Sequence, residues 1–207
     1  MIDFAFPHNI GSPHVLRANR ADDDRLAPML VRAFEQDPLM NWVFESLRSE
    51  GKELYFRTML ELAHAYDGVW TIDPRLACAL WAPPGKWRVS LGNQVTLLPR
   101  LARMLGASRL GRGMKTFDRL QKEHRSEPHY YLGTLGVDPG VQSQGIGSAL
   151  LRAGLDRADH EQVGAYLETA EERNLDFYKR HGFEVTKDLS FGPGAPTCWL
   201  MWRAPRS

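Results

Sequence analysis

The chain has 207 residues, of which 43% are hydrophobic and 25% are charged, so its composition is that of an ordinary globular protein and not of a disordered or collagen-like chain. Its 26 basic and 25 acidic side chains nearly cancel, which removes the global charge argument for a nucleic-acid or membrane-surface protein. The longest uninterrupted apolar run, residues 77–82, is far shorter than the roughly 20 residues that cross a bilayer. We therefore expect neither a nucleic-acid partner nor a membrane partner.

The first 13 residues and the two cysteines indicate the compartment. Residues 1–13 lack the basic and apolar regions of a secretory signal, so we expect a cytoplasmic protein. Cys78 and Cys198 do not make a disulfide framework, and each is expected to be a small buried hydrophobic side chain. Because no period of 20 to 50 residues repeats, we expect one domain over residues 1–207.

The N-terminal half contains short elements with recognisable boundaries. Asn19 and the acidic cluster at residues 22–24 can cap a helix and supply negative charge at its N-terminus. Pro38 interrupts the helical pattern, and the turn at residues 73–75 predicts a hairpin. In chain order we expect a strand at 14–18, a helix to about residue 34, a helix at 50–66 and a hairpin of strands at 68–72 and 77–81.

Residues 86–117 are basic on a background with helical spacing, and they contain no acidic residue. Two interpretations stay open: a solvated helix face, or a surface that meets an anionic ligand. The seven basic residues are Lys86, Arg88, Arg100, Arg103, Arg109, Arg112 and Lys115.

The C-terminal half is more regular. Strands that alternate with helices argue for an α/β or mixed sheet, in which ligands sit at the carboxyl ends of strands. The expected elements are a strand at 129–137, a helix at 145–160, a strand at 165–169, a helix at 174–181, and strands at 183–190 and 197–203.

A glycine-bearing loop joins the first of these strands to the following helix. Gly145 and Gly147 let backbone N–H groups approach a ligand at a helix N-terminus, an arrangement suited to phosphate. A nucleotide P-loop is excluded because no lysine follows Gly147. A dinucleotide-binding oxidoreductase stays a weak alternative, because the third glycine of that fingerprint is Leu150, although Glu168 lies where a ribose-binding acid is expected.

The pattern Gln142-x-x-Gly145-x-Gly147 resembles the acetyl-CoA loop of the GNAT N-acetyltransferase superfamily. Residues 167–169 and 173–183 are similar to its second signature, and the spacing of Asn174 and Tyr178 with the closing residues 199–202 is most similar to the branch containing puromycin N-acetyltransferase. The resemblance covers residues 129–203. It implies an α/β fold with a mixed, mainly antiparallel central sheet flanked by helices, the GNAT acyl-CoA N-acyltransferase fold.

The resemblance also implies an activity, transfer of the acetyl group of acetyl-CoA to a primary amine, and a set of cofactor-binding positions. The loop would hold the cofactor phosphates, the strand before it the thioester carbonyl and pantetheine arm, and Asn174 the arm as well. Gln142 and Gln144 are neutral where the family loop often has a basic residue, so phosphate binding would depend more on backbone N–H groups. The positions are Leu135, Gly136, Val137, Gln142, Ser143, Gln144, Gly145, Ile146, Gly147, Ser148 and Asn174.

The reaction requires an acid and a base. Tyr178 is expected to donate a proton to the leaving thiolate, because a tyrosine is protonated at neutral pH. Glu168 is the first candidate to take the proton of the amine and His129 the second, whereas His124, His160 and His181 are expected at the surface or at helix ends. Structural interpretations stay open beside these: Gly136 as a bulge, Asn174 as a helix cap, Tyr178 at the edge of the core and Glu168 on an exposed strand face.

The acceptor and the assembly are less defined by the sequence. No metal-binding or nucleophile-elbow motif occurs, so we expect no metal and direct attack by the amine. The acceptor pocket is expected from residues 37–66 and 86–126, and the resemblance favours a small-molecule amine. A homodimer stays open, as does a non-catalytic acyl-CoA-binding module. Aromatic residues that could line the pocket or belong to the core are Trp42, Phe44, Tyr55, Phe56, Trp81 and Trp87.

Overall fold

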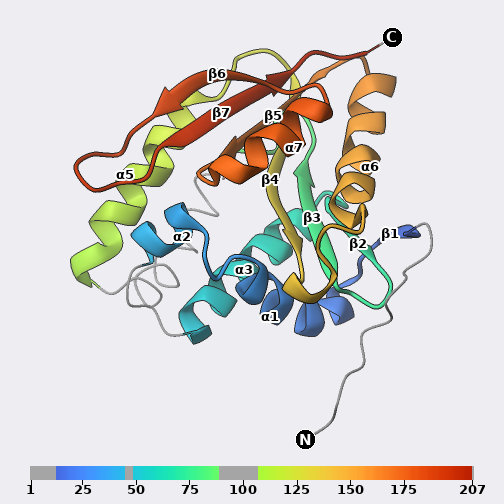
Figure 1. The fold of residues 1–207 in the computed structure, drawn as a ribbon, viewed down its shortest axis with the longest axis horizontal. Coiled ribbons are helices and arrows are strands. Elements are labelled where there is room, and N and C mark those ends of the chain that lie inside the picture. The colour runs from blue at the N-terminus through green and yellow to red at the C-terminus, as the bar shows by residue number, and fades with distance from the viewer. Residues whose placement is uncertain (1–12, 45–48, 89–106, 207) are drawn as a thin grey trace, which may run out of the picture.

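The computed structural model describes residues 13–44, 49–88 and 107–206, which form a seven-stranded sheet of order β1-β2-β3-β4-β5-β7-β6 with helices on both faces (Figure 1). Only β4 and β5 pair in parallel, and the other neighbours are antiparallel. The expected mixed α/β fold is therefore confirmed, and a doubly wound parallel sheet is excluded. The strands are β1 (Val15–Arg17), β2 (Val69–Ile72), β3 (Ala77–Ala82), β4 (His129–Val137), β5 (Gly164–Thr169), β6 (Glu184–Leu189) and β7 (Cys198–Arg203).

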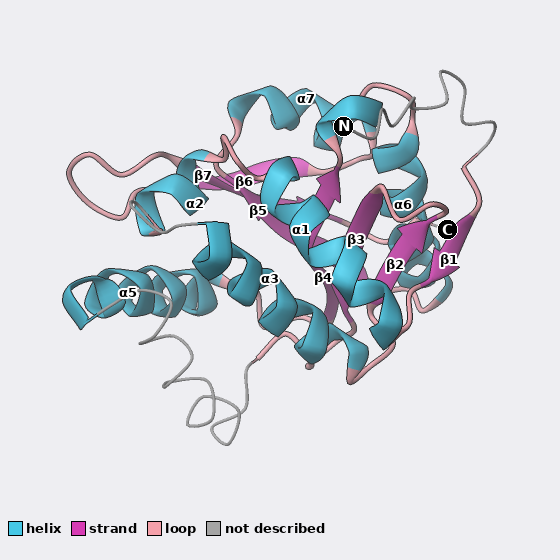
Figure 2. Ribbon diagram, turned by 90° about the horizontal axis from the view of Figure 1, so that it is seen from below, coloured by secondary structure: helices cyan, strands magenta, loops and turns pink. Residues whose placement is uncertain are grey.

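Two layers of helix cover the sheet, with α1, α3 and α5 on one face and α6 and α7 on the other (Figure 2). Residues of β3 alternate between them, because successive side chains of a strand point to opposite faces. Cys78 and Leu80 pack among α1 and α3, and Trp81 packs beneath α6. The helices are α1 (Asp23–Ala33), α2 (Pro38–Val43), α3 (Ser49–His64), α5 (Ala107–Glu123), α6 (Ile146–His160) and α7 (Leu175–Arg180), with short 3-10 turns η1 (Arg20–Asp22), η2 (Pro139–Val141) and η3 (Glu172–Asn174).

Outside the basic segment, the predicted elements agree with these bounds to within two residues, with α2 as the omission. In the basic segment, residues 86–88 are not helical and α5 continues past residue 117 to Glu123. The helix α2 begins at Pro38, where the sequence was interpreted as an interruption, because proline is tolerated in the first turn and the Asp37 carboxylate accepts a hydrogen bond from Met40 N at 2.8 Å. Residues 89–106 of the basic segment lie outside the described residues. Cys78 and Cys198 are buried free thiols, as expected. In the described part of the chain, no helix is long and apolar enough to span a membrane.

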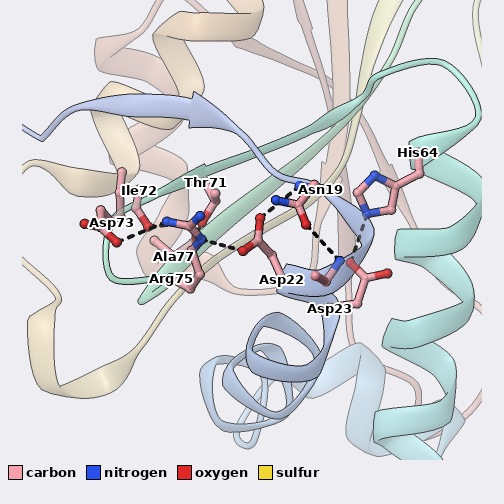
Figure 3. A network of polar contacts seen from close by, with 10 residues as sticks. Asn19, Asp22, Asp23, His64, Thr71, Ile72, Asp73, Arg75 and Ala77 are labelled. Atoms are coloured by element: carbon pink, nitrogen blue, oxygen red, sulfur yellow. Dashed lines mark hydrogen bonds and ion pairs between the residues drawn. The ribbon is translucent and has the colours of Figure 1, made fainter.

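A polar network fixes the N-terminal end of α1 against the hairpin and α3 (Figure 3). Arg75 donates from Nε to Asp22 Oδ1 at 2.8 Å, and His64 Nε2 lies 2.9 Å from Asp23 Oδ1. Asn19 accepts a hydrogen bond from Ala21 N and so caps the 3-10 turn η1 that leads into α1, whereas Asp22 at the N-cap of α1 makes no side-chain capping bond. The network anchors one end of α1, and the other end of that helix reaches the cleft described below.

The strands β4 and β5 begin side by side and then separate. Their parallel pairing extends from His129 to Leu132 on β4, while β5 stays paired with β7 to Thr169. The register between β3 and β4 skips Gly133, which marks a bulge where the separation starts. Beyond this point, alternate backbone groups of β4 face away from β3 into the gap, because antiparallel pairing uses only every second residue's N–H and C=O.

Candidate active site

A cavity of about 560 Å³ lies where β4 ends, between the N-terminus of α6 and α7. It contains every predicted cofactor-binding position except Gln144, which is exposed. The strand and helix segments therefore bring together residues from two separate sequence signatures. Besides those positions, the lining includes Ala33, Phe34, Asp37, Val141, Glu171, Arg173, Phe177, Tyr178 and Arg180.

The turn after β4 is fixed by Asp138, a buried carboxylate. Asp138 accepts hydrogen bonds from Arg32 Nη2 at 2.6 Å and from Gly140 N at 3.1 Å. The Gln142 side chain donates to Val137 O at 3.1 Å, closing the loop on the strand. These bonds hold the loop in place relative to α1 and β4.

Gly145 starts α6 in the left-handed region with φ of 78°, a conformation that disfavours side chains with a Cβ. The first intrahelical bond that involves it runs from Ala149 N to Gly145 O at 3.0 Å. The N–H groups of Ile146, Gly147 and Ser148 therefore have no earlier helical carbonyl to bond, since a helix leaves its first donors unpaired. A helix N-terminus with free donors at a cavity fits a phosphate or pyrophosphate group.

Two arginines at this cavity are not among the predicted cofactor-binding positions. Arg173 and Arg180 line it from the turn before α7 and from the end of α7. Arg173 also lies 3.1 Å from the Glu171 carboxylate. The described members of the basic segment, Lys86, Arg88, Arg112 and Lys115, are exposed and line neither cavity, so both interpretations of that segment stay open.

Gly136 faces α1, and its role differs from a bulge. A Cβ at this position would lie 2.6 Å from Leu30 Cδ2 and 3.3 Å from Ala33 Cβ, so the glycine lets α1 pack tightly against β4. The bulge lies at Gly133 instead, because the register of β3 and β4 is regular at Gly136. Close packing of α1 brings Phe34, the residue after that helix, to the wall of the cavity.

A second cavity of about 150 Å³ continues from the first, between β4, the end of β5, and α2 and α3. Tyr178 and Asn174 line both cavities, at the point where they meet. Asn174 occupies the N-cap position of α7 but its side chain makes no capping bond, so the capping interpretation is wrong. Burial and then the Asp37 carboxylate raise the pKa of Tyr178, which keeps its hydroxyl protonated at neutral pH.

Asp37 also lines both cavities, and the sequence interpretation did not single it out as a functional residue. Burial raises its pKa, against the hydrogen bond that its carboxylate accepts from Met40 N. A carboxyl group with a raised pKa beside a cleft is a candidate proton acceptor. The available signal was its place directly before Pro38, which is also the signature of a helix start.

Glu168 lines only the smaller cavity, and its side chain is 7% exposed, so the exposed-face interpretation is wrong. Its Oε1 lies 3.3 Å from Nε2 of His124, whose side chain is 3% exposed. His124 does follow a helix end, but it is not at the surface. His129 is buried and lines neither cavity, and therefore cannot contact the acceptor directly in this arrangement.

The aromatic candidates divide between the smaller cavity and the packing around it. Tyr55 and Phe56 line this cavity. Burial raises the pKa of Tyr55 to about 12, so that its hydroxyl is also protonated at neutral pH. Trp81 is core, packed on Gly154 of α6, while Trp42 stacks on Phe191 and Phe44 contacts Tyr55. Trp87 stacks on His124, behind the cavity.

The fold and the cleft combine a separating pair of strands with a helix N-terminus whose first N–H groups are unpaired within the helix. A model of the acetyltransferase (GNAT) family matches residues 103–183. A Corynebacterium glutamicum structure described as histone acetyltransferase HPA2 and related acetyltransferase is 26% identical, with TM-score 0.70, and the match covers 95% of this chain and 98% of that one. The chain has the GNAT fold, and the GNAT acetyltransferase superfamily is supported by the family model and the structural neighbours.

Other matches are more distant or partial. Arylalkylamine N-acetyltransferase 2 of Aedes aegypti is 12% identical with TM-score 0.68, over 95% of this chain and all of that one, which shows the fold alone. Mycothiol acetyltransferase of Propionibacterium freudenreichii subsp. shermanii is 39% identical over 66 residues, 30% of this chain and 21% of that protein. A probable serine/threonine-protein kinase of Dictyostelium discoideum is 24% identical over 206 residues, 87% of this chain and 22% of that protein. The chain thus spans about a fifth of the length of these curated relatives.

Proposed function

We propose that this protein is an acetyl-CoA-dependent N-acetyltransferase that acts on a primary amine of a small molecule. One observation carries the proposal: the phosphate-binding loop, the free edge of β4 and Tyr178 line one cavity, which continues into a smaller one with a buried carboxylate. A cofactor and an acceptor held in these two spaces would meet at Tyr178. The puromycin N-acetyltransferase branch is kept as part of the proposal through the spacing of Asn174 and Tyr178.

The larger cavity suits coenzyme A because its chemistry changes along its length. The α6 N-terminus, Arg173 and Arg180 would hold the phosphate groups by unpaired N–H donors and positive charge. The free edge of β4 at residues 135–137 would pair with the pantetheine amides and hold the thioester carbonyl oxygen. Acetyl-CoA supplies the activated acyl group, and one structural neighbour is described as bound to CoA.

Tyr178 is proposed as the general acid that protonates the leaving sulfur. Its proton is retained at neutral pH because burial and Asp37 raise its pKa. The same effects weaken it as an acid, so donation requires the developing thiolate to lie against the hydroxyl. A proton taken up by Asp37 would remove one of these effects, because an uncharged carboxyl no longer opposes the tyrosinate.

The base of the reaction is proposed to be Glu168, with Asp37 as a second candidate from the structure. Both carboxyls line the smaller cavity, Glu168 at the end of β5 and Asp37 at the start of α2. An alkyl ammonium must lose a proton before its nitrogen can attack a carbonyl. Direct attack then needs no covalent enzyme intermediate.

A small cationic amine is the proposed acceptor. Among the described residues, those that line the smaller cavity include two carboxylates and no lysine, arginine or histidine. Its volume of about 150 Å³ is that of a cavity able to hold a benzene-sized group, and its other walls are largely aromatic and aliphatic. Neighbours of the same fold are described as arylalkylamine, agmatine and polyamine N-acetyltransferases, which supports an amine acceptor.

Free-thiol release from acetyl-CoA, measured with a panel of small amines, tests the proposal. Tyr178→Phe should lower kcat by about 10²- to 10⁴-fold, the usual contribution of a general acid, while thermal stabilisation by CoA is retained. Phe34→Leu, at the same junction, is the control for altered packing. If Tyr178→Phe left the rate unchanged, Tyr178 would not be the general acid. If no amine released thiol while CoA still stabilised the protein, a non-catalytic acyl-CoA-binding module would replace the enzyme.

A further inference from the structure

His124 contacts the Glu168 carboxylate and His129 contacts His124 in turn, and neither histidine lines the smaller cavity. His124 Nε2 is 3.3 Å from Glu168 Oε1, and this oxygen has no hydrogen-bond partner in the described part of the chain. His124 Nδ1 is 3.3 Å from His129 Nε2, and His129 Nδ1 is 2.7 Å from the carbonyl oxygen of Glu127. The four groups form one continuous series of polar contacts from the cavity wall to the backbone of Glu127, an exposed residue.

The contact of His129 Nδ1 with the Glu127 carbonyl oxygen determines which nitrogen atoms of the two histidines carry hydrogen. A carbonyl oxygen only accepts, so His129 must carry its hydrogen on Nδ1. Burial lowers the pKa of His129, which leaves it neutral with Nε2 as an acceptor. His124 must then carry a hydrogen on Nδ1, so that its Nε2 is the atom that faces Glu168.

The presence or absence of one proton between His124 Nε2 and Glu168 Oε1 therefore determines whether these two atoms form a hydrogen bond. Without it, a nitrogen lone pair faces a carboxylate oxygen, and neither atom can donate. With it, the contact becomes a charge-assisted hydrogen bond between imidazolium and carboxylate. The buried position makes this difference large, because little water is available to satisfy either group.

Aromatic rings hold His124 in this orientation. Its ring stacks on Trp87, with centroids 3.8 Å apart and an interplanar angle of 11°. The ring centroids of Tyr166 and Tyr131 lie 4.5 and 4.7 Å from that of His124. Burial and then Glu168 raise the pKa of both tyrosines, so neither competes with His124 as a base. The enclosure keeps Nε2 of the imidazole turned toward Glu168.

Several other charged and titratable groups lie around His124 and Glu168, on the elements that pack against these two residues. Glu123 of α5 is bound by Lys187 of β6 at 2.6 Å, and Arg125 lies over Trp202 of β7. Arg88 lies over the Trp87 ring. The remaining groups are His129 and Tyr131 of β4, Tyr166 of β5, Cys198 of β7, Tyr55 of α3, Asp37 before α2, and Glu127.

We propose that His124 is a positioning residue that shares one proton with Glu168, so that the pair and not the carboxylate alone receives the proton of the acceptor amine. This inference rests on the proposed function. One N–H bond of the ammonium breaks, Glu168 takes the proton and passes it on, and one N–H bond forms at His124 Nε2. The positive charge moves from the ammonium to the imidazolium, and no electrons are transferred to or from the protein.

The proton returns by the same route. His129 cannot pass it further, because its Nδ1 hydrogen already faces a carbonyl oxygen that accepts no proton. It leaves through Glu168 to water in the cavity once the uncharged amide product has gone. Activity therefore requires that neither Glu168 nor His124 Nε2 carries the extra proton at the start of each turnover. kcat/KM should fall as pH decreases, because the pair then already holds that proton in more of the molecules.

Pairwise substitution tests the proposal through the pH dependence of kcat/KM. In His124→Gln the amide still donates to Glu168, but only the carboxylate can accept the proton. An imidazole ordinarily holds its proton about two pH units above a carboxyl, so the acid limb should move to lower pH by about one to two units and kcat should fall more than KM changes. His160→Gln, an exposed histidine at the end of α6, should leave the profile unchanged.

A spectroscopic measurement separates this inference from the proposed function. Nitrogen-15 NMR of the full chain without substrate should show His124 protonated at Nδ1 throughout, with Nε2 titrating, and Glu168→Gln should move that titration to lower pH. An identical acid limb in His124→Gln, or a His124 titration insensitive to Glu168→Gln, overturns the pair while acetylation still stands. If the wild type acetylates no amine but the NMR coupling is present, the proposed function fails and the proton-sharing pair survives.

Discussion

Substitution of the two glycines of the loop at the start of α6 should abolish binding of coenzyme A with only a moderate loss of stability. Gly145 has φ of 78°, and an alanine held there costs about 1–2 kcal/mol. Gly147 tolerates a Cβ, which would lie 3.6 Å from Phe177 Cζ and 3.7 Å from Val137 Cγ2, but a valine there would occupy the cavity. The double variant Gly145→Ala with Gly147→Val thus both distorts and fills the phosphate site.

The expected size of the effect follows from linkage. A ligand at about 100 times its dissociation constant stabilises the folded state by roughly 2.7 kcal/mol. For a chain of this length, each kcal/mol shifts Tm by about 2–4 °C, so acetyl-CoA or CoA should raise Tm of the wild type by about 5–11 °C. The double variant should begin at a lower Tm and show no rise with either ligand.

A matched control separates strain from the loss of the site. Gly194 lies in the loop between β6 and β7 with φ of 76°, and a Cβ there would meet no atom within 4 Å. Gly194→Ala therefore carries the same backbone strain and should lower the starting Tm without changing the rise with CoA. Thermal unfolding with CoA, acetyl-CoA and NAD distinguishes the cases. A full rise in the double variant would refute the loop as the phosphate site, and no rise in the wild type with either CoA species would refute acyl-CoA binding.

Two further predictions concern the scaffold of the site. Asp159→Asn should lower the free energy of unfolding by about 3 kcal/mol at pH 7, because it leaves the buried Arg203 guanidinium without its bidentate carboxylate. Arg203 holds the pKa of Asp159 below its ordinary value, so this stabilisation is present above the pKa of the unfolded state and is lost as pH falls through the pKa of the folded state. Urea unfolding should therefore show a smaller difference in stability between wild type and Asp159→Asn at pH 3 than at pH 7. A difference that does not depend on pH would contradict the assignment. Gly154→Ala should destabilise the protein by about 1–3 kcal/mol, because a Cβ there overlaps the Trp81 indole, whereas Gly111→Ala in α5, with open space around it, should be neutral or stabilising in the same denaturation assay.

The sequence by itself determined the local features of the C-terminal half. The strand at 129–137 has the bounds that the structure shows, and the glycine pattern placed the start of α6 within one residue. These features depend on side-chain periodicity and backbone freedom, which act over a few neighbouring residues. The resemblance of the loop and of residues 173–183 to one superfamily added the positions around the larger cavity.

Only the tertiary structure decided which groups meet across the cleft. Arg32 and Asp138 lie 106 positions apart and bond at 2.6 Å, and the separation of β4 from β5 after Leu132 depends on which strand each one pairs with. His124 was expected at the surface because a histidine after a polar helix carries no local sign of burial, yet Trp87 and β5 enclose it. Asp37 lines both cavities because α2, which it precedes, packs through Leu39 against a cluster of residues from β5, β6 and β7. A sequence pattern reports how each residue relates to its own element, whereas the charge and proton chemistry of a site arise from contacts between elements.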